Sequence, residues 1–287
     1  MTEEIDADDK DEKPAPKKWN MYQAIILDIF ERNYHGGEEF EFSREEIADT
    51  ADRLGIKRPK NLGDVVYTFR YRRPLPKPIL DAQPDGRYWL ILGAGDARYR
   101  FRLSNLATVM PTRGMMVRKI PDATPEIISQ YALTDEQALL AKIRYNRLID
   151  IFLGIAAYSL QNHLRTKISN YGQIEIDELY VGVDSRGAQY IVPVQAKGGK
   201  DTIGVIQTIQ DTTFCQTQKR YRHCIARPVS AQFMANDTIA LFELHFDGND
   251  VSIISEKHYR LSNAKDIGEK ELAAYRLPEP TYGMLAV

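Results

Sequence analysis

The sequence predicts an α/β protein, in which a helical N-terminal module with a β-hairpin precedes a mixed central sheet flanked by helices. Three observations predict it. Apolar residues recur with helical spacing near the N-terminus, two β-rich runs then enclose a glycine-containing turn, and the spacing becomes strand-like after residue 173. The chain has 287 residues, 43% hydrophobic and 27% charged, which is enough for one large domain or two modest ones.

The first residues predict a tail without a core, because seven of the first twelve are acidic and few are apolar. We therefore divide the chain into a disordered acidic tail over 1–18, an N-terminal domain over 19–118 and an α/β domain over 119–287. The longest apolar stretch, 148–160, is too short for a bilayer span of roughly 20 residues, so we expect no membrane. Without a signal pattern or a disulfide framework, we expect a cytoplasmic protein.

Three helices are expected at the start of the N-terminal domain. Helical spacing of apolar residues begins at Met21 and stops near residue 35. Ser43 with Glu46 fits a capping box for a second helix that ends near Gly55. Asn61 is suited to cap a third helix, which is short, basic and closed by a proline at position 74.

Strand-like runs over 87–92 and 97–103 predict a hairpin after these helices. Three helices followed by a hairpin is the order of a winged-helix domain, whose third helix enters the major groove. The alternative is a helical domain whose hairpin only supports dimer contacts. The candidate DNA-binding residues of the winged-helix interpretation are Asn61, Thr68, Arg70, Arg72, Arg73, Arg98 and Arg100.

The charge of this region supports a polyanionic partner. Between residues 56 and 119 there are fourteen lysines and arginines against four aspartates, interleaved with aromatic residues, although the whole chain has a net charge of −2. A basic field of this kind binds phosphates, because counterions are released on contact. The alternative is an ordinary solvated surface.

The second domain is expected to alternate between helix and strand. Residues 134–169 predict one further helical region. Residues 202–211 predict a helix capped by Asp201. The predicted strands are 173–183, 190–196, 222–233, 238–246 and 251–261.

A polar constellation falls on the first two of these strands. If they pair through the turn at 185–187, Asp177, Gln195 and Lys197 converge at their ends. A carboxylate and an amide oxygen, with the backbone carbonyl of Ala196, suit Mg²⁺. The Lys197 ammonium would help an attacking water and balance the charge of a phosphorane-like transition state.

Two carboxylates compete with Asp177, because a register error of one residue exchanges the faces of a strand. We rank Asp177 first, Glu175 second and Glu178 third as the metal-binding acid. The alternative for the whole group is a structural hairpin whose Lys197 extends to solvent. Lys200 is a further candidate phosphate contact.

This arrangement of acidic strand, glycine turn, Gln195-Ala196-Lys197 and a following helix resembles the PD-(D/E)xK nucleases, particularly type II restriction endonucleases, with the Gln-x-Lys variant of Mrr-type enzymes. The resemblance covers roughly 143–261. It implies a restriction-endonuclease-like sheet, with Asp177 as the metal-binding acid, Gln195 in the place of the second acid and Lys197 as the motif lysine. Gln195 lacks the charge of an acidic residue, which is expected to weaken metal affinity.

The resemblance implies a Mg²⁺-dependent, sequence-specific endonuclease acting on double-stranded DNA. It further implies a homodimer, which matches a palindromic site, and a cognate DNA methyltransferase in the same host. Two alternatives remain open. One is an Mrr-type modification-dependent or repair nuclease, and the other is a non-catalytic DNA-binding regulator with a nuclease-like domain.

Overall fold

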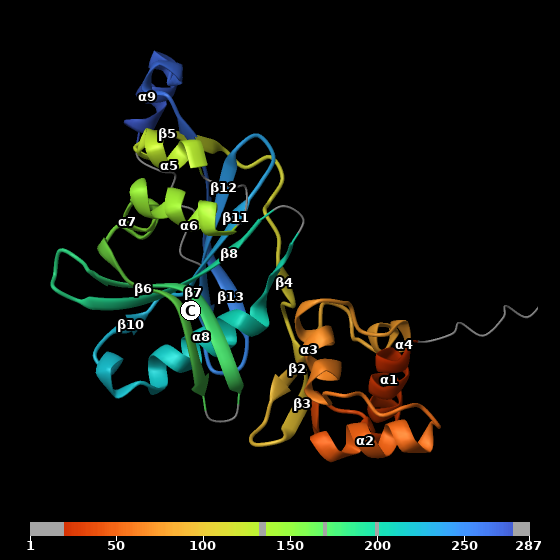
Figure 1. Cartoon of the computed structure of the whole chain (residues 1–287). Helices are drawn as coiled ribbons and strands as arrows, with labels where there is room; N and C mark the ends of the chain where they lie inside the picture. The colour runs from red at the N-terminus through yellow and green to blue at the C-terminus, as the bar shows by residue number, and fades with distance from the viewer. Residues whose placement is uncertain (1–19, 132–135, 169–170, 199–200, 278–287) are drawn as a thin grey trace, which may run out of the picture.

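The computed structural model of the chain describes residues 20–131, 136–168, 171–198 and 201–277. Within them the protein is a mixed α/β structure with two parts, seen side by side in Figure 1. We call residues 20–104 the N-terminal unit and the described residues from 105 to 277 the sheet unit. The predicted acidic tail, 1–18, and Lys200 lie outside the described residues.

The N-terminal unit packs its helices against a three-stranded antiparallel sheet of order β1-β3-β2. The predicted helices and hairpin are present, and one strand, β1, had not been predicted. Its core contains Ile25, Ile47, Val66, Trp89 and Phe101, all buried. Its elements are α1 (Met21–Asn33), β1 (Glu39–Ser43), α2 (Arg44–Arg53), α3 (Gly63–Tyr71), α4 (Lys77–Asp81), β2 (Tyr88–Gly93) and β3 (Arg98–Ser104).

Local hydrogen bonds explain where the helices begin. Ser43 Oγ accepts a hydrogen bond from the Glu46 amide, and the Glu46 carboxylate accepts one from the Ser43 amide. The predicted capping box is therefore present. Asn61 does not cap α3 as predicted. Its Oδ1 accepts from the Gly63 amide at 3.1 Å and closes the turn before the helix, whose N-cap position is Leu62.

The sheet unit is built on an eight-stranded mixed sheet of order β5-β13-β12-β11-β8-β7-β6, with β10 beside β8. Its helices and strands are α5 (Glu126–Tyr131), α6 (Glu136–Tyr145), α7 (Leu148–Leu153), α8 (Val205–Thr217), α9 (Glu269–Tyr275), β5 (Val117–Pro121), β6 (Ala156–Ile168), β7 (Gly172–Val183), β8 (Gln189–Lys197), β10 (Ile225–Ala226), β11 (Val229–Phe233), β12 (Thr238–Phe246) and β13 (Val251–Ser262), with two short 3₁₀ turns at Lys219–Tyr221 and Ala264–Asp266. A separate two-stranded ladder joins β4 (Thr108–Val109) to β9 (Ile203–Gly204).

Helices cover both faces of the large sheet (Figure 1). Alternate residues of β8 divide between them: Val192 and Val194 pack with α6 and α7, whereas Ile191 packs with Phe214 of α8. The central strand β8 is therefore buried on both faces. Its neighbours are β7, which is antiparallel, and β11, which is parallel.

Three predictions for this unit are wrong. The predicted strand 222–233 is not continuous, because residues 222–224 form a turn and residues 227–228 separate β10 from β11. The region 134–169 is not helical throughout, because α7 ends at Gly154, which adopts a left-handed conformation (φ +68°), and the chain then forms the edge strand β6. The helix after β8 begins at Val205 with Gly204 at its N-cap, so Asp201 does not cap it. The backbone oxygen of Asp201 instead accepts from Gln232 Nε2.

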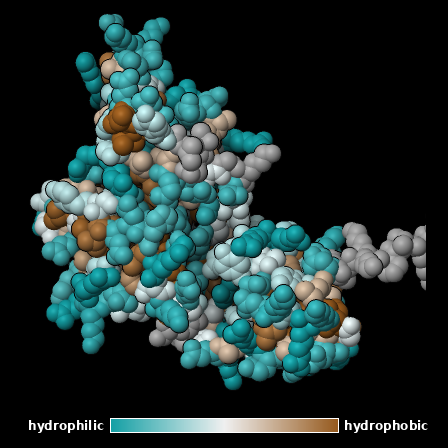
Figure 2. Space-filling model, viewed as in Figure 1, coloured by the Kyte–Doolittle hydropathy of each residue, from teal (hydrophilic) through white to brown (hydrophobic). Residues whose placement is uncertain are grey.

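The predicted boundary at residue 118 falls inside β5, which pairs with β13 in the large sheet. The two units also share contacts. Leu90 and Leu92 of β2 pack with Val205 and Ile206 of α8, and the Asp250 carboxylate accepts from Ser104 Oγ. None of the described helices is long and apolar enough to cross a membrane. The face shown in Figure 2 is largely hydrophilic, with small apolar patches.

Candidate active site and nucleic-acid interface

A groove of about 1810 Å³ runs between the two units. One wall consists of α3 and the β2–β3 hairpin, and the other of the start of β7, the end of β8 and the first turns of α8. Asp177 and Lys197, two of the three predicted catalytic residues, line this groove together with the predicted DNA-binding residues Arg70, Arg72 and Arg73. The structure therefore brings together two groups of residues that were predicted separately.

Asp177 lies where β7 and β8 diverge. Their ladder ends at the pair Glu178 and Val194, and beyond it the Asp177 carboxylate accepts a hydrogen bond from the Ala196 amide at 2.9 Å. Burial raises the pKa of Asp177, and the Ala196 hydrogen bond and the Lys197 charge oppose this rise. Asp177 is thus fixed on the backbone of the strand that carries Gln195 and Lys197.

Gln195 is buried and faces α8. Its Nε2 donates to Asp211 Oδ2 at 2.7 Å and to the backbone oxygen of Glu175 at 3.0 Å. These two bonds turn its Oε1 toward Gln207, whose Nε2 lies 3.4 Å away. Gln195 is therefore on the same face as Asp211 but is already engaged by protein partners.

Asp211 is the residue that the sequence analysis missed as a member of this site. It lies on α8, its side chain is buried, and it is electrostatically coupled to both Asp177 and Lys197. Burial raises its pKa well above the usual range, and the nearby Asp177 charge adds to this rise. Asp211 and Gln207 are four residues apart on α8 and therefore lie on the same face of the helix. This spacing was the only sequence signal that could have placed Asp211 in the site.

The competing carboxylates are separated by the fold. Glu178 points to the opposite face of the sheet, where its Oε1 is 2.8 Å from Arg144 Nε of α6. Glu175 stays on the rim of the groove, paired with Arg165 at 3.1 Å, and this pair lowers its pKa. The structure therefore brings Glu175, and not Glu178, near Asp177.

The predicted DNA-binding residues have different environments. Arg72 and Arg73 are exposed at the end of α3, and Arg72 lies over the Tyr67 ring at 4.9 Å. Arg98 and Arg100 are partly neutralised, because both pair with Glu41 of β1. Glu41 lies outside residues 56–119, the range over which the excess of positive charge was found.

Three of the predicted DNA-binding residues at α3 line a second, smaller hollow or close the turn before the helix. Thr68 and Arg72 line a second hollow with Tyr22 and Asp64. Asn61 donates to Asp64 Oδ1 at 2.9 Å, in addition to closing the turn before α3. Asn61 is thus engaged by its local neighbours, whereas Thr68 lines an opening.

Asp177 is one of four carboxylates that line the groove; the others are Asp96, Glu175 and Asp201. Asp177 supplies one carboxylate, which has a single hydrogen bond among the described residues, and Gln195 supplies an amide oxygen turned toward Gln207. No group of three or more His, Cys, Asp or Glu side chains that could hold a metal ion occurs within the described part of the chain. Asp177, Gln195 and the Ala196 carbonyl are oxygen donors of the kind that one hard cation uses when it keeps much of its water.

Comparison of the chain with protein-family models, with curated proteins and with solved structures gave no match.

Proposed function

We propose that this protein is a Mg²⁺-dependent endonuclease that hydrolyses phosphodiester bonds in double-stranded DNA, in the role of a type II restriction enzyme. The observation that carries the proposal is the shared groove, which is lined both by Asp177 and Lys197 and by the exposed arginines at the end of α3. A phosphate backbone bound by Arg72 and Arg73 would lie within the same groove as a carboxylate and an ammonium group.

The topology supports this proposal. Elements follow in the order α1, β1, α2, α3, β2, β3, and the sheet order is β1-β3-β2, which fits a winged-helix domain. A mixed sheet with α6 and α7 on one face and α8 on the other fits a restriction-endonuclease-like domain. In that interpretation α3 reads DNA and the sheet unit cuts it.

Each residue then has a distinct role. Asp177 would hold the ion, with Gln195 Oε1 and the Ala196 carbonyl as further oxygen donors. A bound Mg²⁺ would supply Lewis acidity at the scissile phosphate. Lys197 would orient the attacking water and stabilise the negative charge that develops on the phosphate oxygens.

Two partners follow from the same proposal. A homodimer would place two such grooves about a palindromic site, so that both strands are cut. A cognate DNA methyltransferase would protect the host DNA. Neither partner bears on the chemistry of a single groove, which can be tested alone.

Replacing Lys197 tests the proposal directly. Unmethylated phage DNA is incubated with Mg²⁺ and the full chain, either wild-type, Lys197→Ala or the control Lys265→Ala, whose exposed lysine lies far from the groove in the turn Ala264–Asp266. We expect Lys197→Ala to slow cutting at least about 100-fold, because a charge that stabilises the transition state is lost. Lys265→Ala should cut like the wild type.

DNA binding in the absence of Mg²⁺ separates the alternatives. Lys197→Ala should bind DNA within a few-fold of the wild type, because Arg72 and Arg73 are intact. Equal cutting by both variants would refute the site. Cutting of methylated DNA alone would favour the Mrr-type alternative, and an intact duplex that stays bound in Mg²⁺ would favour the regulator.

A further inference from the structure

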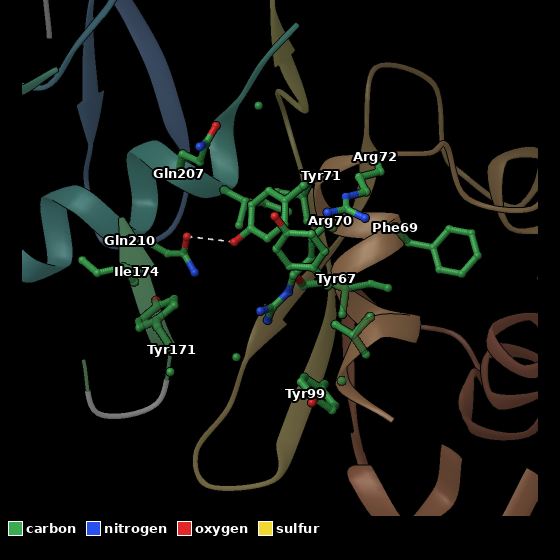
Figure 3. Close-up of a pocket in the computed structure, with 18 of the residues that line it drawn as sticks. Tyr67, Phe69, Arg70, Tyr71, Arg72, Tyr99, Tyr171, Ile174, Gln207 and Gln210 are labelled. Carbon is green, nitrogen blue, oxygen red and sulfur yellow. Dashed lines mark hydrogen bonds between the residues drawn. The ribbon is translucent and has the colours of Figure 1, made fainter. Parts of the chain in front are cut away.

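Besides Tyr88 of β2, four tyrosines line the groove, and the nuclease chemistry proposed above uses none of them. Tyr67 and Tyr71 come from α3, Tyr99 from β3 and Tyr171 from the residues before β7, so both units contribute (Figure 3). The rings of Tyr67 and Tyr71 lie 4.9 Å apart. Tyr67 is 45% exposed and Tyr71 36%, which leaves aromatic surface open in the groove.

Arg70 lies among these rings with an unused donor. Its Nε donates to the Ile91 backbone oxygen at 2.7 Å, and its guanidinium lies 5.7 Å from the Tyr99 ring. Its Nη2 is buried and has no hydrogen-bond partner among the described residues. A buried donor without a partner is costly, so an acceptor brought by a ligand would stabilise this position.

Gln210 supplies a second donor from the opposite wall. The Tyr71 hydroxyl donates to Gln210 Oε1 at 2.9 Å, shown as the dashed line in Figure 3. This bond fixes the amide, so that Nε2 is the group left for a ligand. Gln210 is only 4% exposed, and no described residue accepts a hydrogen bond from its Nε2.

We propose that this part of the groove, the tyrosine pocket of Tyr67, Tyr71, Tyr99 and Tyr171 with Arg70 and Gln210, receives a single nucleobase. Tyrosine rings stack on the faces of bases. Both free protein groups are donors, which favours a base edge with two acceptors, as in guanine O6 and N7, over adenine, which presents a donor. The base can come from duplex DNA, by extrusion, or from a free nucleotide. The first source rests on the proposed function, and the second does not.

The first experiment measures base recognition without cleavage. Calorimetry in EDTA compares dGMP, dAMP and deoxyribose 5-phosphate as ligands of the full chain. We expect dGMP to bind more tightly than dAMP, and deoxyribose 5-phosphate, which lacks a base, to bind too weakly to measure. Equal binding of deoxyribose 5-phosphate and dGMP would show phosphate binding alone and would overturn the proposal.

Variants of Tyr71 locate the binding. Tyr71→Ala should weaken dGMP binding at least about tenfold, because a stacking ring is lost. Tyr71→Phe keeps the ring but loses the hydroxyl that fixes the Gln210 amide, so it should bind dGMP more tightly than Tyr71→Ala but with less preference over dAMP than the wild type. Tyr158→Ala, at an exposed tyrosine of β6, should change nothing. If Tyr71→Ala does not fold, Tyr67→Ala serves the same purpose at a more exposed position. Unchanged dGMP binding in a folded Tyr71→Ala or Tyr67→Ala variant would overturn the proposal.

Duplexes distinguish the two sources of the base. Fluorescence anisotropy in EDTA compares one duplex when intact, with one bulged guanine and with one bulged adenine, since an unpaired base costs least to extrude. A tighter complex with the bulged guanine, lost in Tyr71→Ala, assigns the pocket to DNA. Binding of dGMP without any gain from the bulge assigns it to a free nucleotide and overturns the extruded-base source.

Nucleotide binding and DNA cleavage are measured separately, so one proposal can fail without the other. A chain that binds guanine but leaves DNA intact in Mg²⁺ would refute the proposed nuclease and keep the pocket. A chain that cuts DNA but binds no nucleotide would refute the pocket alone.

Discussion

Asp211 has a buried carboxyl group in a helix, held by the amide of Gln195 at 2.7 Å. Its raised pKa has a consequence for stability. The unfolded chain ionises an aspartate near pH 4, whereas the folded chain holds this proton to a higher pH. Between these two pKa values the folded state binds more protons, so its free energy of unfolding falls as the pH rises.

Asp211→Asn tests this coupling. The variant keeps the shape and an oxygen that accepts from Gln195 but removes the ionisation. We expect the free energy of unfolding to fall less between pH 4 and pH 8 in the variant than in the wild type, as measured by denaturant unfolding. The pKa of Asp177 is also raised, so a smaller slope of the same sign should remain. Equal slopes would contradict the prediction, and Asp85→Asn, at an exposed position, is the control.

At the candidate site, only the residues that depend on strand spacing could be proposed from the sequence. Asp177, Gln195 and Lys197 carry a recognisable order along two paired strands, and two of them line the groove. The roles of Asp211 and Gln210 depend instead on how α8 packs against β8 and α3. Such packing brings residues of distant segments together, and no local spacing encodes it.

At the scale of elements, the capping box of α2 makes a contribution that can be measured. Ser43→Ala removes the acceptor for the Glu46 amide and should destabilise the N-terminal unit by about 1 kcal/mol. Ser43→Asp restores an acceptor and should recover most of this loss. Unfolding followed by tryptophan fluorescence reports it, because Trp89 is buried in the same unit. A loss as large in Ser43→Asp as in Ser43→Ala would contradict the role of the cap.

Elements with a clear period were predicted, and β6 was not. The capped helices, the β2–β3 hairpin and strands β7, β8, β12 and β13 follow their periodicity closely. Strand β6 lies at the sheet edge and exposes residues on both faces, so it lacks a two-residue alternation. The apolar run 148–160 spans both α7 and the start of β6, and only Gly154 marks the point where the helix ends.

At the scale of the whole molecule, the charge on the wall of the groove should set the salt dependence of DNA binding. Arg72 and Arg73 are exposed there, whereas Arg98 and Arg100 are paired with Glu41. Replacing both Arg72 and Arg73 with Ala should reduce the slope of log K against log salt by about 1.8, since each phosphate contact contributes roughly 0.9. Anisotropy titrations at several salt concentrations measure this slope.

A control with the same change of charge completes this prediction. Lys77→Ala with Lys265→Ala also removes two positive charges, but Lys77 is paired with Asp81 and Lys265 lies in the sheet unit. This double variant should leave the slope close to that of the wild type. A similar fall in both double variants would mean that net charge, and not the end of α3, governs the affinity.

Among the described residues, no strand pairs with the outer side of the thirteen-residue strand β6 in the large sheet. Such an edge is a template on which another extended chain can add, and it favours aggregation. The β6–β7 ladder shifts register between Ser159 and Gln161, and His163 has a left-handed backbone (φ +48°), so the outer row of donors and acceptors is broken in its middle. Substitutions that remove this irregularity would make the outer row of donors and acceptors continuous and would therefore favour the addition of a second extended chain.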